Sequence, residues 1–517
     1  MELNRRQFVG ASSVAGLGVA GVAALASARA LADEAKVADV PAEEPSATYD
    51  CDVVIVGCGI SGLSAAVQAG ELGLNTIALE AGEQVGGNGQ GVEGIFGCGT
   101  SGQIEQGIEL DSGAIVRHEL EQAQHLPDGT LWTDLVKASA ENYDWLVEQG
   151  VEFSGVINDY GGLYPTMHWF GGDKAGIGYV PHMEGKAEEY GVQFMRSTAA
   201  QSLRTDADGR VCGVTATDAD GATIQVNASA VILASGGFGY NDDMLAAWGF
   251  NLEHLGKVGN PLNNGDGIRM ALAVGAQDCT ADACFLAAPN IDGLFAKGDA
   301  SGKLGFGGPV IWVNQDGERF VNEDLAADNI MSVALPTITQ KQCYCLLDST
   351  ILGSILNGPR SVTAATDVPA DEEFASVLEE CPSDNVYQCD TIAEVAEKFG
   401  IDAEALQATV DAYNVDCAVG TDSYFGKDAS QMLPVENGPF TMFRLDVDVM
   451  VAIGGLGTNR NMQVLAEDGT PIEGLYAIGV DGVRLYRKVY PINIGATCCG
   501  NNVNSGRIAV RHIASLL

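Results

Sequence analysis

The residues with the clearest chemistry in this sequence are three glycines followed by an acid. Gly57, Gly59 and Gly62 have the spacing Gly-x-Gly-x-x-Gly, and Glu80 stands beyond them. In this pattern the first glycine makes a tight turn, the second lets the main chain approach a pyrophosphate, and the third lets a helix pack closely on a strand. An acid at such a distance accepts hydrogen bonds from ribose hydroxyls. These residues therefore predict a dinucleotide-binding site.

The elements that must position these residues occur in the required order. Val53–Val56 is an apolar run typical of a buried strand, Leu63–Leu72 has the pattern of a helix, and Thr76–Leu79 predicts a second strand that ends at Glu80. The helix would begin at the glycines and present its N-terminal amides to the phosphates. Strand, turn, helix and strand in this order predict a Rossmann-like α/β unit.

Glycine-rich segments further along the chain extend this pattern. They are Gly86-Gly87-Asn88, the apolar run 230–234 with the glycines after it, the Gly-Asp-Gly turn within 260–267, and the strand-like run 474–479. Together the segments resemble the flavin side of the fumarate reductase and 3-ketosteroid dehydrogenase superfamily. The resemblance runs from about residue 50 to residue 512 and keeps the order of the motifs. It implies that the dinucleotide is FAD.

The resemblance assigns cofactor contacts position by position. It places Ser61 at the pyrophosphate and Leu203 near the adenine. The family usually has an acid directly after the glycine of the last strand, but Val480 stands there and Asp481 follows, so we expect Asp481 to make the ribitol contact. The expected cofactor-binding residues are Gly57, Gly59, Ser61, Gly62, Glu80, Gly87, Asn88, Glu93, Gly94, Leu203, Asp266, Asp481, Asn502 and Val503.

The length of the chain predicts more than one folding core, because 517 residues exceed a typical domain. Between the flavin motifs lie a hairpin pattern with Asp316-Gly317 at its turn, a capping box at Thr391, and a helix start at Asp402. By the resemblance, this insert is a capping domain. We expect an α/β fold in which a Rossmann-like FAD-binding domain, at 50–285 and 451–517, carries an α+β capping domain at 286–450. The cleft between the two domains is then the expected catalytic site.

The substrate side departs from the pattern of the fumarate reductases. Those enzymes, by the resemblance, use arginines and a histidine to hold two carboxylates and to deliver a proton. The corresponding positions here are Lys303, Phe306, Ala327, the segment Val451–Gly455 and Thr497. A carboxylate buried without a cation is costly. We therefore expect a small substrate that is less charged and more hydrophobic than fumarate.

Three residues are the candidates for catalysis. Tyr490, followed by Gly495-Ala496-Thr497, resembles the ketosteroid dehydrogenase tyrosine that holds a substrate carbonyl; the other interpretation is a structural tyrosine at a domain edge. His168 lies in the aromatic segment 160–170 and is the histidine that we expect to act as an acid, although such a segment also suits an apolar anchor between lobes. Arg487 is the third candidate.

Several functions remain open at this stage. The first is reduction of an activated C=C bond, as in an enone, with a hydroxyl that polarises the carbonyl. The second is a ketosteroid-like dehydrogenase that runs in the oxidative direction, or a reductase of an unsaturated carboxylate other than fumarate. The third is a flavin-loaded electron carrier or ligand binder. Because we expect no nicotinamide-binding unit, the expected electron donor is an external cytochrome or quinol-linked protein.

The N-terminal residues have the pattern of a targeting signal. Asn4-Arg5-Arg6-Gln7-Phe8 and the small-residue run after it predict a twin-arginine signal peptide at 1–32, a linker at 33–49 and export to the periplasm or the outer face of the envelope, without stable membrane insertion. A formal net charge of −42 argues against nucleic acid as a partner. The 13 cysteines form no Cys-x-x-Cys, so we expect buried free thiols and no metal site.

Overall fold

The computed structural model describes residues 44–160, 162–291, 300, 304, 308–328, 330–358, 368–380, 384–482 and 484–517. The expected signal peptide at 1–32, both Lys303 and Phe306, and the side chain of Ala327 lie outside this description. The first strand begins at Ala47, inside the expected linker. Among the described residues, no helix is both long enough and apolar enough to cross a membrane.

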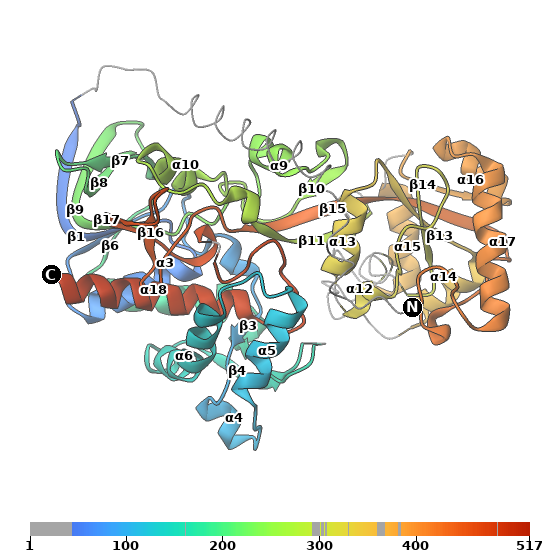
Figure 1. Ribbon diagram of the computed structural model, residues 1–517, viewed down its shortest axis with the longest axis horizontal. Coiled ribbons are helices and arrows are strands. Elements are labelled where there is room, and N and C mark those ends of the chain that lie inside the picture. The colour runs from blue at the N-terminus through green and yellow to red at the C-terminus, as the bar shows by residue number, and fades with distance from the viewer. Residues whose placement is uncertain are drawn as a thin grey trace, which may run out of the picture.

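An eight-stranded sheet carries the glycine motifs (Figure 1). Strand β1 (Ala47–Val56) lies between β2 (Thr76–Leu79) and β9 (Thr223–Leu233), parallel to both. Strand β17 (Pro471–Ala477) is parallel to β9 on its other side. The sheet is completed by β6 (Gln193–Met195), β7 (Ala199–Thr205), β8 (Val211–Thr217) and β16 (Gln463–Leu465). The carboxyl ends of β1, β9 and β17 therefore meet at one edge, where ligands of open α/β sheets bind.

The two faces of this sheet pack against different layers, because successive side chains of a strand point to opposite sides. Val53 and Ile55 belong to the core that includes α3 (Ile60–Glu71) and α18 (Thr497–Leu516). Val54 and Val56 belong to a separate core with α10 (Asp266–Ala273). Helix α18 runs beside α3 on the side of the sheet away from α10 (Figure 1).

Further helices and a small sheet extend the layer that contains α18. The helices are α5 (Ser112–Gln122), α6 (Gly129–Glu148) and α8 (Val180–Glu189). The sheet has the order β3 (Gly94–Phe96), β5 (Met167–Phe170) and β4 (Phe153–Asn158), and all its pairs are antiparallel. A Cβ atom on Gly500 would lie 2.8 Å from the Cβ of Phe96, so β3 packs directly on the first turns of α18.

The second lobe is built on a six-stranded sheet with its own hydrophobic core, whose residues lie between Ile291 and Leu445. The strands of this sheet are β10 (Leu255–Lys257), β11 (Cys284–Asn290), β12 (Ile311–Asn314), β13 (Cys343–Leu347), β14 (Val386–Cys389) and β15 (Phe440–Ile453). Side chains of β10 and β11 pack into a core of the first lobe. The helices of the second lobe are α12 (Leu325–Asp328), α13 (Met331–Ile338), α14 (Ser349–Leu356), α15 (Ala370–Glu380), α16 (Ile392–Phe399) and α17 (Ala403–Val419). This confirms an α/β fold with an α+β insert.

The local signals in this lobe behave as the sequence predicts, with two differences. Thr391 and Glu394 form the capping box of α16, and Asp402 caps α17, which runs on to Val419. The expected hairpin at Asp316-Gly317 is reduced to a single bridge between Val313 and Arg319. Strand β12 pairs along its length with β13, and Arg319 turns inward to a buried ion network with Glu323.

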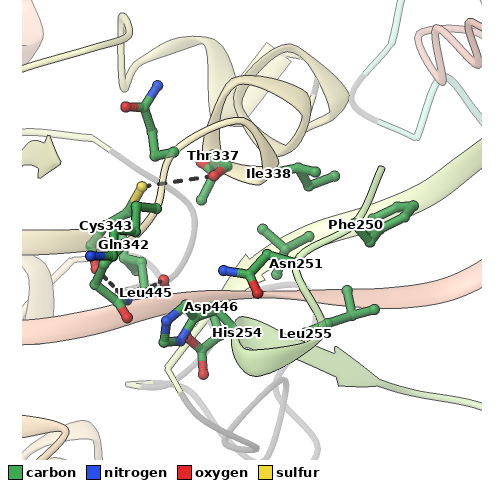
Figure 2. Close-up of a pocket in the computed structure, with 13 residues that line it drawn as sticks. Phe250, Asn251, His254, Leu255, Thr337, Ile338, Gln342, Cys343, Leu445 and Asp446 are labelled. Carbon is green, nitrogen blue, oxygen red and sulfur yellow. Dashed lines mark hydrogen bonds and ion pairs between the residues drawn. The ribbon is translucent and has the colours of Figure 1, made fainter. Parts of the chain in front are cut away.

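Strand β15 joins the two lobes (Figure 1). Its first half pairs with β13 and β14 of the second lobe, and its second half pairs with β10 and β11. A small, open pocket lies against β15 at this crossing, with Phe250 and His254 on one side and Thr337 of α13 on the other (Figure 2). It lies beside the strand that connects the lobes and is lined by none of the expected cofactor or catalytic residues.

Short helices complete the described structure. They are α4 (Ser101–Glu105), α7 (Ala175–Gly178) and α9 (Asp242–Trp248).

Candidate active site

The glycine turn after β1 forms a cradle that side chains would fill. Gly57 has φ +96°, and a Cβ atom on it would lie 2.4 Å from the carbonyl oxygen of Ala234. A Cβ atom on Gly62 would lie 2.0 Å from the carbonyl oxygen of Gly57. Helix α3 starts after Gly59 with no side-chain cap and no acid in its first turn. Its N-terminal amides are therefore open to an anion, as a pyrophosphate site requires.

Glu80 holds this turn from the end of β2. One of its carboxylate oxygens accepts a hydrogen bond from the amide of Cys58 at 2.9 Å, and the other accepts one from the amide of Gly82 at 2.9 Å. Burial raises the pKa of Glu80, and these amides oppose the rise. The amide of Ala81 is a third donor that lowers this pKa. A carboxylate has about four acceptor sites, so Glu80 can still accept a hydrogen bond from a ribose.

The ends of β9 and β17 are tied together by Asp481. Its carboxylate accepts hydrogen bonds from the amide of Ser235 at 2.7 Å and from the amide of Gly237 at 2.9 Å. The hydroxyl of Ser235 donates to the same carboxylate and accepts from the amide of Gly267 at 3.2 Å. Asp481 is 0% exposed, and these donors engage both of its carboxylate oxygens. This placement favours a role in holding the turns over the expected contact with the ribitol chain.

Three segments that are far apart in the sequence meet beside the glycine turn. Gly479 follows the end of β17 by two residues and has φ +63°. A Cβ atom on it would lie 2.5 Å from the hydroxyl of Ser61 and 3.2 Å from the amide oxygen of Asn502. That amide oxygen is buried and has no hydrogen-bond partner among the described residues. Helix α18 starts after Ala496 without a side-chain cap, so its first amides are also open. An extended ligand with a pyrophosphate and polar flavin edges fits these open donors and acceptors.

The loop that is expected to pass the flavin is anchored on both sides. The side-chain amide of Asn88 donates to the carbonyl of Met450 at 3.1 Å, and its oxygen accepts from the amide of Asn260. Glu93 accepts a hydrogen bond from the hydroxyl of Tyr160 at 3.2 Å. A Cβ atom on Gly94 would clash with the main chain of His168. These contacts position the loop.

The other expected cofactor residues lie at its margins. Gly87 has φ +50° and stands beside Asn260. Leu203 is half-buried on β7, Asp266 pairs with Arg269 on α10, and Val503 is buried on α18. Their contacts with the cofactor stay predictions.

A second Gly-x-Gly-x-x-Gly does occur, at 97–102, although we expected no second dinucleotide-binding unit. It follows β3, a three-residue strand of an antiparallel sheet, and leads into the five-residue α4. The N-terminus of α4 is already occupied by the capping box of Thr100 and Gln103. This segment lacks the parallel strand and the open helix start of a nucleotide site, so it does not bring in a nicotinamide cofactor site.

Tyr490 lies where α18, β11 and the segment before α18 meet. It is 6% exposed, and its ring packs edge-on against Tyr486 at 4.8 Å between centroids. Its hydroxyl hydrogen-bonds the side chain of Thr497, and Cys284 and Cys498 lie close enough to influence its pKa, which burial raises well above the usual range. The thiol of Cys284 in turn lies 3.8 Å from the carbonyl oxygen of Ile453. Hydroxyl, thiol and aliphatic groups thus surround Tyr490.

His168 does not have the environment of an acid, which corrects the expectation. It is 1% exposed, its Nε2 lies 2.8 Å from the hydroxyl of Thr100, and its Nδ1 lies 3.0 Å from the carbonyl of Thr166. A carbonyl only accepts, so Nδ1 carries the proton and Nε2 accepts from Thr100. Burial lowers the pKa of His168 to about 4. A neutral imidazole with both nitrogens engaged serves as a structural link between β5 and α4.

Arg487 is also turned away from the cluster around Tyr490. Its guanidinium pairs with the carboxylate of Asp282, which also lies 3.7 Å from the ammonium of Lys488. Arg484, in the same segment, donates to Asp128 at 2.7 Å and to the carbonyl of Thr458. Both arginines are therefore engaged by partners on other elements, and Arg487 does not have the placement of a catalytic cation.

One buried acid near the tyrosines stands in no sequence motif. Glu119 on α5 is buried, and its charge influences the pKa of both Tyr486 and Tyr490. The adjacent His118 hydrogen-bonds the side chain of Asn493 at 2.9 Å and so fixes α5 beside this segment. A glutamate in a helix without a motif is usually a surface residue, so only the tertiary contacts could identify it.

A flavoprotein oxidoreductase is the class of protein that fits this site. The features that indicate it are the glycine cradle, the open helix starts and the cluster around Tyr490. The profile of the FAD binding domain family matches residues 52–493, and the chain belongs to this family. Its cofactor is FAD.

Known proteins that resemble the chain are named as reductases or dehydrogenases. The vinyl phenol reductase of Lactiplantibacillus plantarum is 29% identical over 480 residues, which cover 90% of this chain and 96% of that protein. The urocanate reductase of Eggerthella lenta is 28% identical over 92% of this chain and 77% of its own length. The fold matches the structure of 3-ketosteroid-delta4-(5alpha)-dehydrogenase from Rhodococcus jostii with 4-androstene-3,17-dione, with a TM-score of 0.66 and 24% identity over 92% of this chain and 99% of that chain. The chain is thus an FAD-dependent oxidoreductase that acts on CH–CH groups.

Proposed function

We propose that this protein reduces the activated C=C bond of an uncharged, largely hydrophobic unsaturated carbonyl compound. The observation that carries the proposal is the composition of the cluster around Tyr490. Thr497 lies there, at the position where the resemblance places a carboxylate-binding arginine of the fumarate reductases. Val451, which stands in place of their substrate-binding histidine, lies on β15 two residues before Ile453. A dianionic substrate would lose its hydration without gaining a cation at these positions.

The residues of the cluster suit a neutral carbonyl. When bound in reduced form, FAD supplies the hydride. The hydroxyl of Tyr490 donates a hydrogen bond to the carbonyl oxygen, where negative charge grows during the reaction. The buried apolar side chains around it, such as Ile453 and Ile494, exclude water and so strengthen this hydrogen bond. We propose that the second lobe closes the cleft from the other side.

Two relatives support an uncharged, hydrophobic acceptor, and one of them supports a carbonyl group. The Lactiplantibacillus plantarum relative is named for a vinyl phenol, a conjugated alkene without a carboxylate. The Rhodococcus jostii structure holds a steroid ketone. The Rhodococcus jostii protein is named as a dehydrogenase, which favours the alternative that the physiological reaction runs toward the unsaturated product. The tyrosine is compatible with this alternative, because it would polarise the ketone in either direction.

The electron supply is part of the proposal. Among the described residues, no group of three or more His, Cys, Asp or Glu side chains could hold a metal ion, and the sequence has no Cys-x-x-Cys-His for a haem. We propose an external cytochrome or quinol-linked donor outside the cytoplasm, after twin-arginine export directed by residues 1–32.

Anaerobic stopped-flow absorbance tests the proposed function and its direction. The FAD-loaded protein is photoreduced and mixed with enones, vinyl phenols and unsaturated dicarboxylates. We expect rapid reoxidation of the flavin by uncharged enones or vinyl phenols and slow reaction with fumarate. Bleaching of the oxidised flavin by saturated ketones, without reoxidation by enones, would instead support the dehydrogenase. A preference for fumarate would contradict both the proposed reductase and the alternative dehydrogenase.

A further inference from the structure

Tyr160 is an exposed aromatic residue in an unusual main-chain conformation. It has φ +55°, and 41% of its surface is exposed. The left-handed region is an outlier for a bulky residue, because the side chain crowds its own main chain there. Such strain persists only where the surrounding contacts impose it, and strained residues cluster at ligand-binding sites. The contacts that hold Tyr160 are therefore of functional interest.

Three contacts hold Tyr160 in place. Its amide donates to the side-chain oxygen of Asn158 at 3.2 Å, and the same oxygen accepts a hydrogen bond from Nε1 of Trp169 at 2.9 Å. The rings of Tyr160 and Trp169 lie 5.6 Å apart between their centroids. The hydroxyl of Tyr160 donates a hydrogen bond to Glu93. Residues of β4 and β5 thus fix the main chain and the ring, and Glu93 fixes the hydroxyl.

Tyr160 also lies directly against the segment that forms the candidate active site. A Cβ atom on Gly495 would lie 3.2 Å from the Cβ of Tyr160. Gly495 stands between Tyr490 and Thr497, whose hydroxyls hydrogen-bond each other. Tyr160 therefore covers the middle of the segment that holds the proposed carbonyl-binding hydroxyl.

The turn after Tyr160 carries a second exposed apolar side chain. Leu163 is 57% exposed, and its amide donates to the main-chain carbonyl of Asn493 at 3.2 Å. Asn493 belongs to the same segment before α18. Tyr160 and Leu163 thus form an exposed apolar edge along this segment, which suits the flat face of a hydrophobic ligand.

Glu93 adds a carboxylate to this apolar edge. Its Oε1 lies 3.2 Å from the hydroxyl of Tyr160, and its main-chain carbonyl accepts a hydrogen bond from the amide of Phe170 at 2.9 Å. Burial raises the pKa of the Glu93 carboxyl, and hydrogen bonds from its own amide and from Tyr160, with the charge of Lys174, oppose the rise. A carboxylate has about four acceptor sites, so Glu93 can accept a further hydrogen bond from a ligand.

We propose that Tyr160 and Glu93 determine the substrate specificity of this site and select a flat aromatic acceptor that carries a hydroxyl group. This inference rests on the proposed function and names its substrate class, an enone conjugated with a phenolic ring. The substrate ring packs on the exposed ring of Tyr160, and the phenolic hydroxyl donates a hydrogen bond to the carboxylate of Glu93. The same carboxylate repels a carboxylate on a competing substrate, which adds a repulsive contribution to specificity.

The first test compares three enones that differ in one group. They are para-hydroxybenzalacetone, its methyl ether, and the analogue with a carboxylate in place of the hydroxyl. The phenol should reoxidise the photoreduced, FAD-loaded wild type about tenfold faster than the methyl ether, because the ether cannot donate a hydrogen bond to a charged acceptor. The carboxylate analogue should be the slowest. Equal second-order rate constants for the phenol and the methyl ether would overturn the proposal.

Three variants separate the contributions of the two side chains. Glu93→Leu should abolish the preference for the phenol, and the uncharged Glu93→Gln should raise the rate with the carboxylate analogue about tenfold. Tyr160→Leu should slow the phenol and the methyl ether alike, because the aromatic contact is lost. The exposed Glu253→Gln and Tyr424→Leu are matched controls, and the flavin absorbance spectrum checks that each variant holds FAD. A preference for the phenol that survives in Glu93→Leu would overturn the proposal.

Calorimetric titration of the oxidised, FAD-loaded protein measures binding without turnover. The phenol should bind the wild type about tenfold more tightly than the methyl ether does, and the two should bind Glu93→Leu equally. If this difference is present but none of the compounds reoxidises the reduced flavin, the proposed function fails and the specificity assignment stands. If enones reoxidise the flavin but neither rate nor affinity depends on the hydroxyl, the specificity assignment fails and the proposed function stands.

Discussion

The carboxylate of Asp481 accepts hydrogen bonds from the main-chain amide and the hydroxyl of Ser235, although 246 residues separate the two in the sequence. The end of β17 thereby holds the turn that follows β9. This turn and the glycine turn after β1 lie at the same sheet edge. The hydrogen bonds of Asp481 therefore help to position the main chain of the cofactor site.

Asp481→Asn should destabilise the protein even without FAD. An amide cannot accept all the hydrogen bonds that the carboxylate accepts, and the loss of a buried, charge-assisted hydrogen bond costs about 2 kcal/mol. Thermal unfolding of the FAD-free protein and FAD titration measure the effect, with the exposed Asp220→Asn as control. If Asp481 mainly contacts the ribitol chain, FAD affinity will fall while the stability of the FAD-free protein is unchanged.

Tyr490→Phe should slow substrate reduction about tenfold or more, because one hydrogen bond to the developing oxyanion is lost. Stopped-flow reoxidation of the reduced flavin gives the rate, and the flavin absorbance spectrum checks that the cofactor site is intact. Tyr344→Phe, a buried tyrosine of β13 in the other lobe, is the matched control. A rate for Tyr490→Phe equal to that of the control would remove Tyr490 from the mechanism.

His168→Gln should alter the pH dependence of stability, and the shape of the pH profile of kcat near neutral pH should stay the same. Burial lowers the pKa of His168 to about 4, from about 6.5 for a free histidine. The folded state therefore favours the neutral ring, so this contribution to stability is complete above about pH 6.5 and is lost as the pH falls toward 4. Unfolding free energies from pH 7 to pH 4 should decline less steeply in the variant. A change in the neutral or alkaline part of the pH profile of kcat would indicate that His168 acts as an acid in catalysis.

Asp422→Asn should destabilise the second lobe by about 3 kcal/mol at neutral pH, because it leaves buried cations with fewer partners. Asp422 pairs with Arg319, whose guanidinium also pairs with Glu323, and Lys427 lies 3.5 Å from Glu323. Burial raises the pKa of Asp422, but hydrogen bonds from Arg319 and from main-chain amides outweigh it and hold the pKa at about 2.

The sign of the pH effect follows from that lowered pKa. The stability from Asp422 is complete above about pH 4, the ordinary value for an aspartate, and is lost as the pH falls toward 2. Denaturant unfolding should therefore show a gap between the wild type and Asp422→Asn at pH 7 that narrows below pH 4. A gap of constant size down to pH 3 would contradict the assignment.

Much of the cofactor site could be predicted from the sequence, because each part depends on residues that are close neighbours in the chain. Gly57, Gly62 and Glu80 have fixed spacings that a tight turn, a close helix and a ribose require, and the structure places them at one turn. The caps at Thr391 and Asp402 are predictable for the same reason. The glycine triplet at 97–102 shows where such a pattern fails as a prediction. The strand before it, β3, pairs with β5 in an antiparallel sheet, and the sequence of the triplet does not record this pairing.

The sequence by itself determined that this is an FAD-binding α/β protein with an inserted lobe and a tyrosine-containing segment before the C-terminal helix. Only the tertiary structure decided which side chains surround Tyr490, that His168 and Arg487 are engaged elsewhere, and that Glu119 is buried. The physical reason is that hydrogen-bond partners and burial come from elements distant in the chain. These surroundings set the protonation state of each group, and spacing along the sequence does not record them.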